Sequence, residues 1–284
     1  MTILRHNEPM HPNIDSELPV GIFDSGVGGL TVLQAIRDTL PFEDLVYLGD
    51  TARLPYGTKS PASIVRYATR ATTKLQEQGI KLLVVACNTA SAVALDRLRD
   101  LMSPLPVIGV VEPGADAAVR ARPGGSHLVM ATEATVRLGA YRAAIEARDP
   151  AAVVREHPCE MLVSLAEEGW NSGAIADSIV GRYLDDATES GFEPDGIILG
   201  CTHFPLLRDT IRAAAAESVA IVDSASTTAA VVKNTLDMAG QLRQSDAPGT
   251  VRFMATDGAS RFARVGSQFL GAALEYSDIE IVDL

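Results

Sequence analysis

Two cysteines in matched surroundings are the residues of this chain best suited to chemistry. The segment ending Cys87-Asn88-Thr89 is echoed 114 positions later by a segment ending Cys201-Thr202-His203. In each segment an apolar run typical of a buried strand ends in Cys and is followed by residues that cap helices. Because a helix N-terminus stabilises a thiolate, we expect both thiol pKa values to fall from about 8.5 toward neutrality. The pattern predicts two reactive thiols rather than two small buried side chains.

Two thiols on opposite faces of one substrate suit a reaction that removes a proton from one face and returns one to the other. Racemisation at a carbon beside a carboxylate is such a reaction, with one Cys as thiolate and its partner as thiol. A cysteine–histidine hydrolase is an alternative, but it needs one nucleophile and leaves the second Cys unexplained. Asp24 near Cys87 and His203 beside Cys201 would assist proton movement, whereas Cys159 has no comparable context and is interpreted as structural.

The glycine-rich loop after the first apolar run is the next candidate. Its spacing, Asp24-Ser25-Gly26-Val27-Gly28-Gly29, fits neither a dinucleotide fingerprint nor a P-loop. We interpret it as a tight turn whose backbone N–H groups approach a carboxylate, with Asp24 and Ser25 at the strand end. A plain helix cap is the alternative for Asp24.

Other polar residues follow later apolar runs. Asp50 precedes the turn Pro55-Tyr56-Gly57, which would expose a phenolic hydroxyl to a small polar molecule, although an ordinary turn has the same pattern. Glu167 and Glu168 are adjacent, so at most one is a site residue. No His, Asp or Glu grouping has the spacing of metal ligands, and we predict no metal site. Lys59 could form a Schiff base with pyridoxal phosphate, but nothing around it resembles a cofactor pocket, so we predict no cofactor.

The elements that must position these residues are predicted from short apolar runs that alternate with longer helix-like stretches. Each run is apolar on both faces, which is typical of parallel strands covered by helices. Active sites in such sheets gather at the carboxyl ends of the strands, where both cysteines fall. The sequence therefore predicts an α/β fold, with strands at Val20–Phe23, Leu45–Leu48, Leu82–Ala86, Val107–Val111, Leu128–Ala131, Met161–Leu165, Gly196–Leu199, Val219–Val222 and Val251–Ala255.

Length, charge and composition narrow the remaining possibilities. At ~150 residues per domain, 284 residues predict two domains, and 36 acidic against 24 basic residues give a net charge of −12. This charge argues against nucleic-acid binding and against docking on an anionic membrane. Residues 1–19 are polar and are predicted to form a flexible tail without a secretory signal. Three cysteines are too few for a disulfide framework, so we expect a cytoplasmic protein. Breaks between elements are expected at residues 112–114 and 122–126.

Six ordered motifs, taken together, resemble the glutamate racemase family. The resemblance implies two pseudo-twofold-related α/β domains with parallel central sheets and the active site between them. The first domain would comprise residues 20–111 plus 224–284, and the second would comprise residues 112–223. The motifs are Gly21–Val32, Gly49–Gly57, Ala86–Ser91, Gly109–Gly114, Gly200–Leu207 and Asp223–Ala225.

The same resemblance implies cofactor-independent interconversion of L- and D-glutamate, which supplies D-glutamate for peptidoglycan. In the family, the cysteine matched by Cys87 serves the D-enantiomer and the one matched by Cys201 serves the L-enantiomer. Supporting acidic and imidazole groups match Asp24, Asp50, Glu167 and His203. Substrate-binding positions match Asp24, Ser25, Pro55, Tyr56, Gly57, Asn88, Thr89, Thr202 and His203.

The match departs from the family pattern just before Glu167. The family usually has a Cys-Pro pair there and a second proline before the acid, and this chain has Glu160 and Ser164 in place of the two prolines.

A racemase of aspartate or of a hydantoin is the nearest alternative function. Family members also form homodimers, some need a peptidoglycan precursor as activator, and some inhibit DNA gyrase, so a homodimer and a gyrase contact are further expectations.

Overall fold

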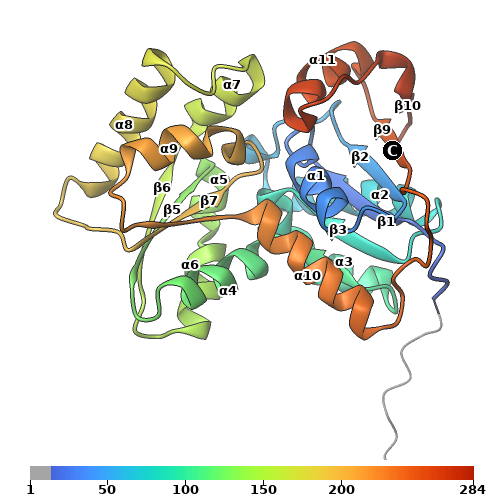
Figure 1. Cartoon of the computed structure of the whole chain (residues 1–284), viewed down its shortest axis with the longest axis horizontal. Coiled ribbons are helices and arrows are strands. Elements are labelled where there is room, and N and C mark those ends of the chain that lie inside the picture. The colour runs from blue at the N-terminus through green and yellow to red at the C-terminus, as the bar shows by residue number, and fades with distance from the viewer. Residues whose placement is uncertain (1–13) are drawn as a thin grey trace, which may run out of the picture.

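The computed structural model describes residues 14–284 as two parallel β-sheets side by side (Figure 1). The first sheet has the order β10-β9-β2-β1-β3-β4 and the second has the order β6-β5-β7-β8, and every neighbouring pair is parallel. The predicted α/β fold with parallel sheets is confirmed. The strands are β1 (Val20–Asp24), β2 (Leu45–Gly49), β3 (Leu82–Val85), β4 (Val107–Gly109), β5 (Ser126–Ala131), β6 (Val153–Pro158), β7 (Gly196–Gly200), β8 (Ala220–Asp223), β9 (Val251–Ala255) and β10 (Ile279–Ile281).

Helices cover these sheets because the strands are apolar on both faces. The central strands β1, β2, β3 and β7 are buried along their whole length. Within residues 14–284, no helix combines the length and apolar character that a membrane crossing requires. The helices are α1 (Leu30–Thr39), α2 (Pro61–Gln76), α3 (Asn88–Met102), α4 (Val111–Ala121), α5 (Glu133–Leu138), α6 (Ala140–Arg148), α7 (Glu160–Glu168), α8 (Ala174–Thr188), α9 (Arg208–Ala214), α10 (Ser224–Met238) and α11 (Ala259–Leu270), with short 3₁₀ turns at η1 (Tyr56–Thr58), η2 (Phe204–Leu207) and η3 (Tyr276–Asp278).

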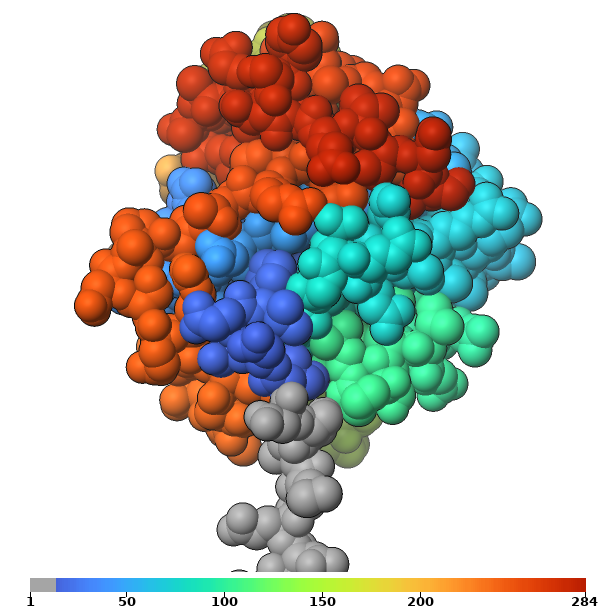
Figure 2. Space-filling view, turned by 90° about the vertical axis from the view of Figure 1, so that its right-hand side faces the viewer, coloured from blue at the N-terminus to red at the C-terminus, as the bar shows by residue number. Residues whose placement is uncertain are grey.

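The chain leaves the first sheet once and returns to it. It passes to the second sheet after β4, and α10 carries it back, packing against both α1 and α4. Figure 2 shows the returning C-terminal segment, orange to red, lying over the same unit as the N-terminal residues in blue. The predicted domain boundaries at 111/112 and 223/224 both lie between a strand of one sheet and a strand of the other. The domain boundaries themselves stay predictions.

The N-terminal tail predicted for residues 1–19 lies mostly outside the described residues. Its last part is anchored, since Ser16 O accepts a hydrogen bond from Lys81 Nζ at 2.5 Å and Pro19 O accepts one from Lys81 N–H at 2.9 Å. The buried Lys81 ammonium also pairs with Glu43 at 2.5 Å. These contacts attach the chain just before β1 to the residue that precedes β3.

Two predicted strands and one predicted break are wrong, and two strands were not predicted. The strand predicted at Met161–Leu165 is part of α7, because Leu162, Leu165 and Ala166 recur at helical spacing and are buried, and a short apolar run alone does not distinguish the two structures. The strand predicted at Val107–Val111 ends at Gly109, and the break expected at 112–114 lies inside α4. Strands β6 and β10 were not predicted, since as edge strands they carry polar, partly exposed residues.

Candidate active site

A cavity of about 260 Å³ lies where the carboxyl ends of strands from both sheets meet. That volume is below the roughly 300–1,000 Å³ of sites for drug-sized ligands, so it suits a small metabolite. Parallel sheets place ligands at this edge of their strands. The first unit lines the cavity with Ser25, Pro55, Tyr56, Gly57, Thr58, Cys87, Asn88 and Thr89, and the second lines it with Thr132, Glu160, Val163, Ser164, Gly200, Cys201, Thr202 and His203.

Cys87 lies two residues after the end of β3 and caps the N-terminus of α3. Its Sγ accepts the N–H of Ala90 at 3.4 Å and its S–H donates to Ser25 Oγ at 3.5 Å. Burial, reinforced by the negative charge of Asp24, raises the pKa of Cys87 to about 12. The expectation of a lowered pKa is therefore wrong for Cys87, because desolvation outweighs the one amide at the helix terminus. Cys87 is a thiol at neutral pH and is poised as an acid.

Cys201 follows β7 and has a different partner. Its Sγ lies 3.7 Å from His203 Nδ1, and His203 Nε2 lies 3.2 Å from Glu167 Oε1. Burial alone would lower the pKa of His203, but the contacts with Cys201 and Glu167 raise it to about 10. The same contact with His203 is the main cause that lowers the pKa of Glu167. An imidazolium between a carboxylate and a sulfur is the charge partner that a thiolate base requires.

The glycine loop packs against the second unit. A Cβ added at Gly28 would lie 2.3 Å from Thr202 Oγ1 and 2.5 Å from His203 Nδ1. Thr31 Oγ1 donates to Thr202 O at 2.9 Å, which ties the start of α1 to the same loop. The loop was predicted to bring backbone N–H groups near a carboxylate. In the structure the N–H of Gly26 donates to the carboxylate of Asp24 at 2.9 Å. Gly28 therefore lets the loops that carry the two halves of the site approach closely.

Neutral hydrogen-bonding groups from both units surround the cavity. Asn88 Oδ1 accepts from Tyr141 OH at 2.7 Å, and its buried Nδ2 has no partner among the described residues. Thr89 Oγ1 lies 3.4 Å from Thr132 Oγ1 and 3.2 Å from Thr135 Oγ1, so hydroxyls from α3 and α5 meet. No Lys or Arg appears in the part of the cavity wall that residues 14–284 form. This lining can hold carboxylates through amide and hydroxyl donors.

Three predicted carboxylates lie behind the cavity wall. Asp50 is buried and accepts hydrogen bonds from Arg53 Nη1 at 2.7 Å, Tyr56 OH at 2.7 Å and Thr256 Oγ1 at 2.9 Å. The prediction that Tyr56 exposes its hydroxyl is wrong, because that hydroxyl holds Asp50 while the residue forms cavity wall. Asp24 is also buried, and desolvation raises its pKa. Glu167 reaches the cavity only through His203.

Helix α7 supplies residues that the sequence prediction did not assign to the site. Glu160, Val163 and Ser164 line the cavity, and Glu167 follows on the same helical face. Glu160 Oε1 accepts the N–H of Glu133 at the start of α5. The available signal was the spacing i, i+3, i+4, i+7, which places these residues on one face of a helix but on both faces of a strand. Thr132 follows the carboxyl end of β5. The rule that active sites gather at the carboxyl ends of parallel strands, which we applied to the two cysteines, could have predicted it as well.

Comparisons with known proteins agree with this geometry. The family model described as Asp/Glu/hydantoin racemase matches residues 28–232. A glutamate racemase of Geobacter metallireducens is 46% identical over 255 residues, covering 90% of this chain and 93% of the relative. The structure of glutamate racemase from Francisella tularensis in complex with D-glutamate is 34% identical with a TM-score of 0.86, covering 94% of this chain and 98% of that one.

A second solved structure gives the same result. Glutamate racemase from Thermus thermophilus, in complex with β-chloro-D-alanine, is 39% identical with a TM-score of 0.85 and covers 95% of this chain and 98% of that one. The family resemblance carried by the six sequence motifs is thereby confirmed over nearly the full length. This chain belongs to the glutamate racemases of the Asp/Glu/hydantoin racemase family.

Proposed function

We propose that this protein interconverts L- and D-glutamate by proton transfer between the substrate α-carbon and two cysteines, supplying D-glutamate for peptidoglycan. The observation that carries the proposal is the placement of Cys87 and Cys201, each at the end of a strand from a different sheet, in one small cavity. The name of its relatives, and the D-glutamate bound in one of them, support glutamate as the substrate.

In the L-to-D direction Cys201 acts as the base. Its thiolate takes the α-proton of L-glutamate, the Cα–H bond breaks, and the electron pair is delocalised into the α-carboxylate. The S–H bond of Cys87 then breaks as its proton forms a new Cα–H bond on the opposite face. Cys201 ends as a thiol and Cys87 as a thiolate, the starting state for the reverse direction. The thiol form of Cys87 and the charged His203 beside Cys201 favour the L-to-D starting state.

The remaining residues hold the substrate and its charges. Ser25, Asn88 and Thr202 offer neutral donors to the two carboxylates, and the first-turn N–H groups of α3 lie beside them. Glu167 pairs with His203 on the Cys201 side, and Asp24 lies under the Cys87 side. We assign these two carboxylates supporting roles in proton transfer.

Exchange of the α-proton in D₂O tests the two-cysteine assignment. The wild-type protein is expected to place deuterium in the newly formed enantiomer without added cofactor. Cys201→Ser should exchange only D-glutamate and Cys87→Ser only L-glutamate, with racemisation abolished in both. Cys159→Ser, which removes a thiol outside the cavity, is the matched control and should racemise normally. Racemisation by Cys201→Ala at a near wild-type rate would refute the assignment.

Substrate profiling tests the choice of glutamate. Exchange and racemisation of aspartate at a rate above that of glutamate would favour the alternative function.

We also infer that the protein acts in the cytoplasm as a homodimer. The DNA gyrase contact stays a prediction from the family resemblance, and gyrase inhibition retained in Cys87→Ser would separate it from catalysis.

A further inference from the structure

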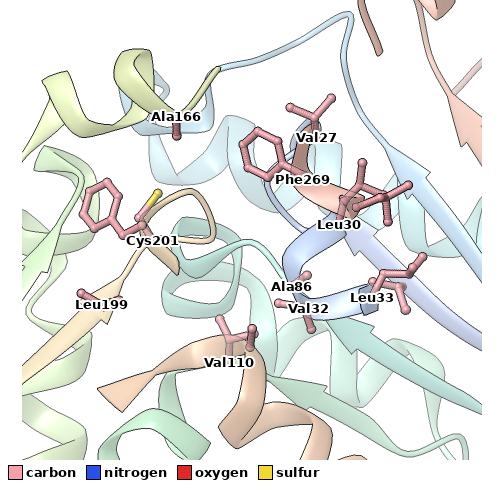
Figure 3. Close-up of a cluster of buried hydrophobic side chains, with 14 of the residues drawn as sticks. Val27, Leu30, Val32, Leu33, Ala86, Val110, Ala166, Leu199, Cys201 and Phe269 are labelled. Carbon is pink, nitrogen blue, oxygen red and sulfur yellow. The ribbon is translucent and has the colours of Figure 1, made fainter. Parts of the chain in front are cut away.

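Helix α11 belongs to the first unit but touches the proton-transfer groups of the second. Arg261 Nη2 lies 2.6 Å from Glu167 Oε2, across 94 residues of sequence. The Phe269 ring packs edge-to-face on the His203 ring, with the centroids 5.1 Å apart. Figure 3 shows Phe269 and Cys201 in one buried hydrophobic cluster, together with Ala166 of α7. Neither Arg261 nor Phe269 lines the cavity, so α11 acts on Cys201 through intermediate side chains.

The two oxygens of Glu167 have separate partners. Oε2 binds Arg261 from α11, and Oε1 faces His203 from the loop after β7. An ion pair at one oxygen restricts rotation of the carboxylate, so Arg261 favours the orientation in which the other oxygen faces His203. Because Arg261 is a cation beside Glu167, it also keeps that carboxylate ionised. Among residues 14–284, the charged groups that act on Glu167 are His203 and Arg261. From α8, Tyr183 packs against α7 at its other end, where its hydroxyl accepts the N–H of Met161.

We propose that Arg261 is a positioning residue that holds Glu167 against His203 and thereby makes proton transfer at Cys201 depend on the packing of α11 against α7. The proposal rests on the two-cysteine function proposed above. Arg261 lies in the first unit and Glu167, His203 and Cys201 lie in the second, so separating the units breaks the contact between Arg261 and Glu167. The Cys201 side of the site is then complete only while α11 contacts α7.

The expected effect of Arg261→Ala is a lower turnover with little change in substrate binding. Because Arg261 is half-exposed, its ion pair is weaker than a buried one, and we expect kcat to fall about 3- to 10-fold with KM nearly unchanged. The enantiomers have equal free energies, so kcat/KM must fall equally in both directions. Proton exchange separates the two thiols. Exchange from L-glutamate, where Cys201 is the base, should slow more than exchange from D-glutamate.

The pH dependence of kcat/KM distinguishes a positioning role of Arg261 from a purely structural role, which would leave this dependence unchanged. Without the neighbouring cation the pKa of Glu167 should rise, because Arg261 is one of the groups that lower it. The acid limb of kcat/KM should therefore move to higher pH in Arg261→Ala. Arg261→Lys, which restores a cation, should return the limb toward its wild-type position.

Arg264→Ala is the matched control for Arg261→Ala. Arg264 is exposed on the same helix, and in the described part of the chain its side chain makes no ion pair or hydrogen bond. It should leave kcat, the exchange ratio and the pH profile unchanged. An Arg261→Ala variant that behaves like Arg264→Ala would overturn the role of Arg261. Lack of proton exchange on glutamate by the wild-type protein would instead overturn the proposed function.

Discussion

Replacing Gly28 by Ala tests the close approach of the two loops that carry the site. Neither Gly28 nor its neighbour Gly26 has a positive φ, so alanine brings no backbone strain at either position. The new methyl at position 28 would lie 2.3 Å from Thr202 Oγ1 and 2.5 Å from His203 Nδ1, whereas ordinary contact begins near 3.4 Å. The side chains of Thr202 and His203 must therefore shift by roughly 1 Å, alone or together with their loop.

The size of the effect follows from that movement. His203 Nδ1 is already 3.7 Å from Cys201 Sγ, near the limit of a hydrogen bond to sulfur, so a shift of this size breaks the contact. A misplacement of about 1 Å can lower the rate about 100-fold, and overpacking a filled interior costs about 1–3 kcal/mol of stability. We expect Gly28→Ala to remain folded with a lower unfolding midpoint and to lose most of its kcat.

Gly26→Ala is the matched control within the same loop. A Cβ at position 26 would meet only Leu54 Cδ2 at 3.5 Å, an ordinary contact, and the backbone N–H that binds Asp24 is kept. Racemase activity by polarimetry and urea unfolding of both variants measure the difference. Wild-type kcat in Gly28→Ala, or an equal loss in both variants, would refute the steric explanation.

Three further predictions follow from the site. His203 stays protonated to a pH of about 10 when folded but only to about 6.5 when unfolded; the unfolding free energy, measured relative to His203→Gln, should therefore fall by about 1.4 kcal/mol per pH unit as pH rises through this window. Urea unfolding at several pH values checks this, and parallel curves would contradict the pairing. Tyr56→Phe should lower the unfolding free energy by about 1–3 kcal/mol, because buried Asp50 loses a hydrogen bond; unchanged denaturant stability would count against it. Glu160→Gln keeps an acceptor for Glu133 N–H but removes a charge from the cavity wall, so KM for anionic glutamate should fall about 2- to 3-fold at low salt; a salt-independent KM equal to wild type would disprove it.

Much of this protein could be predicted from local pattern. Runs that are apolar on both faces predicted eight of the strands as parallel, because the side chains of a covered strand are themselves apolar. The matched segments around Cys87 and Cys201 predicted two strand-end thiols, since a strand and the cap that follows it are neighbours in sequence. Edge strands β6 and β10 and helix α7 were missed, because partial exposure and short apolar runs leave the local signal ambiguous.

Only the tertiary structure determined which role each residue has in the site. Asp50 and Tyr56 were both candidates to face the substrate, but folding turned the hydroxyl of one onto the carboxylate of the other. The pKa of Cys87 rises because burial outweighs the helix terminus, and burial depends on what the rest of the chain packs over it. Thr31 meets Thr202 across 171 residues and Arg261 meets Glu167 across 94. Sequence patterns describe a residue and its near neighbours, whereas proton transfer depends on distances between distant segments, which only packing of the two sheets determines.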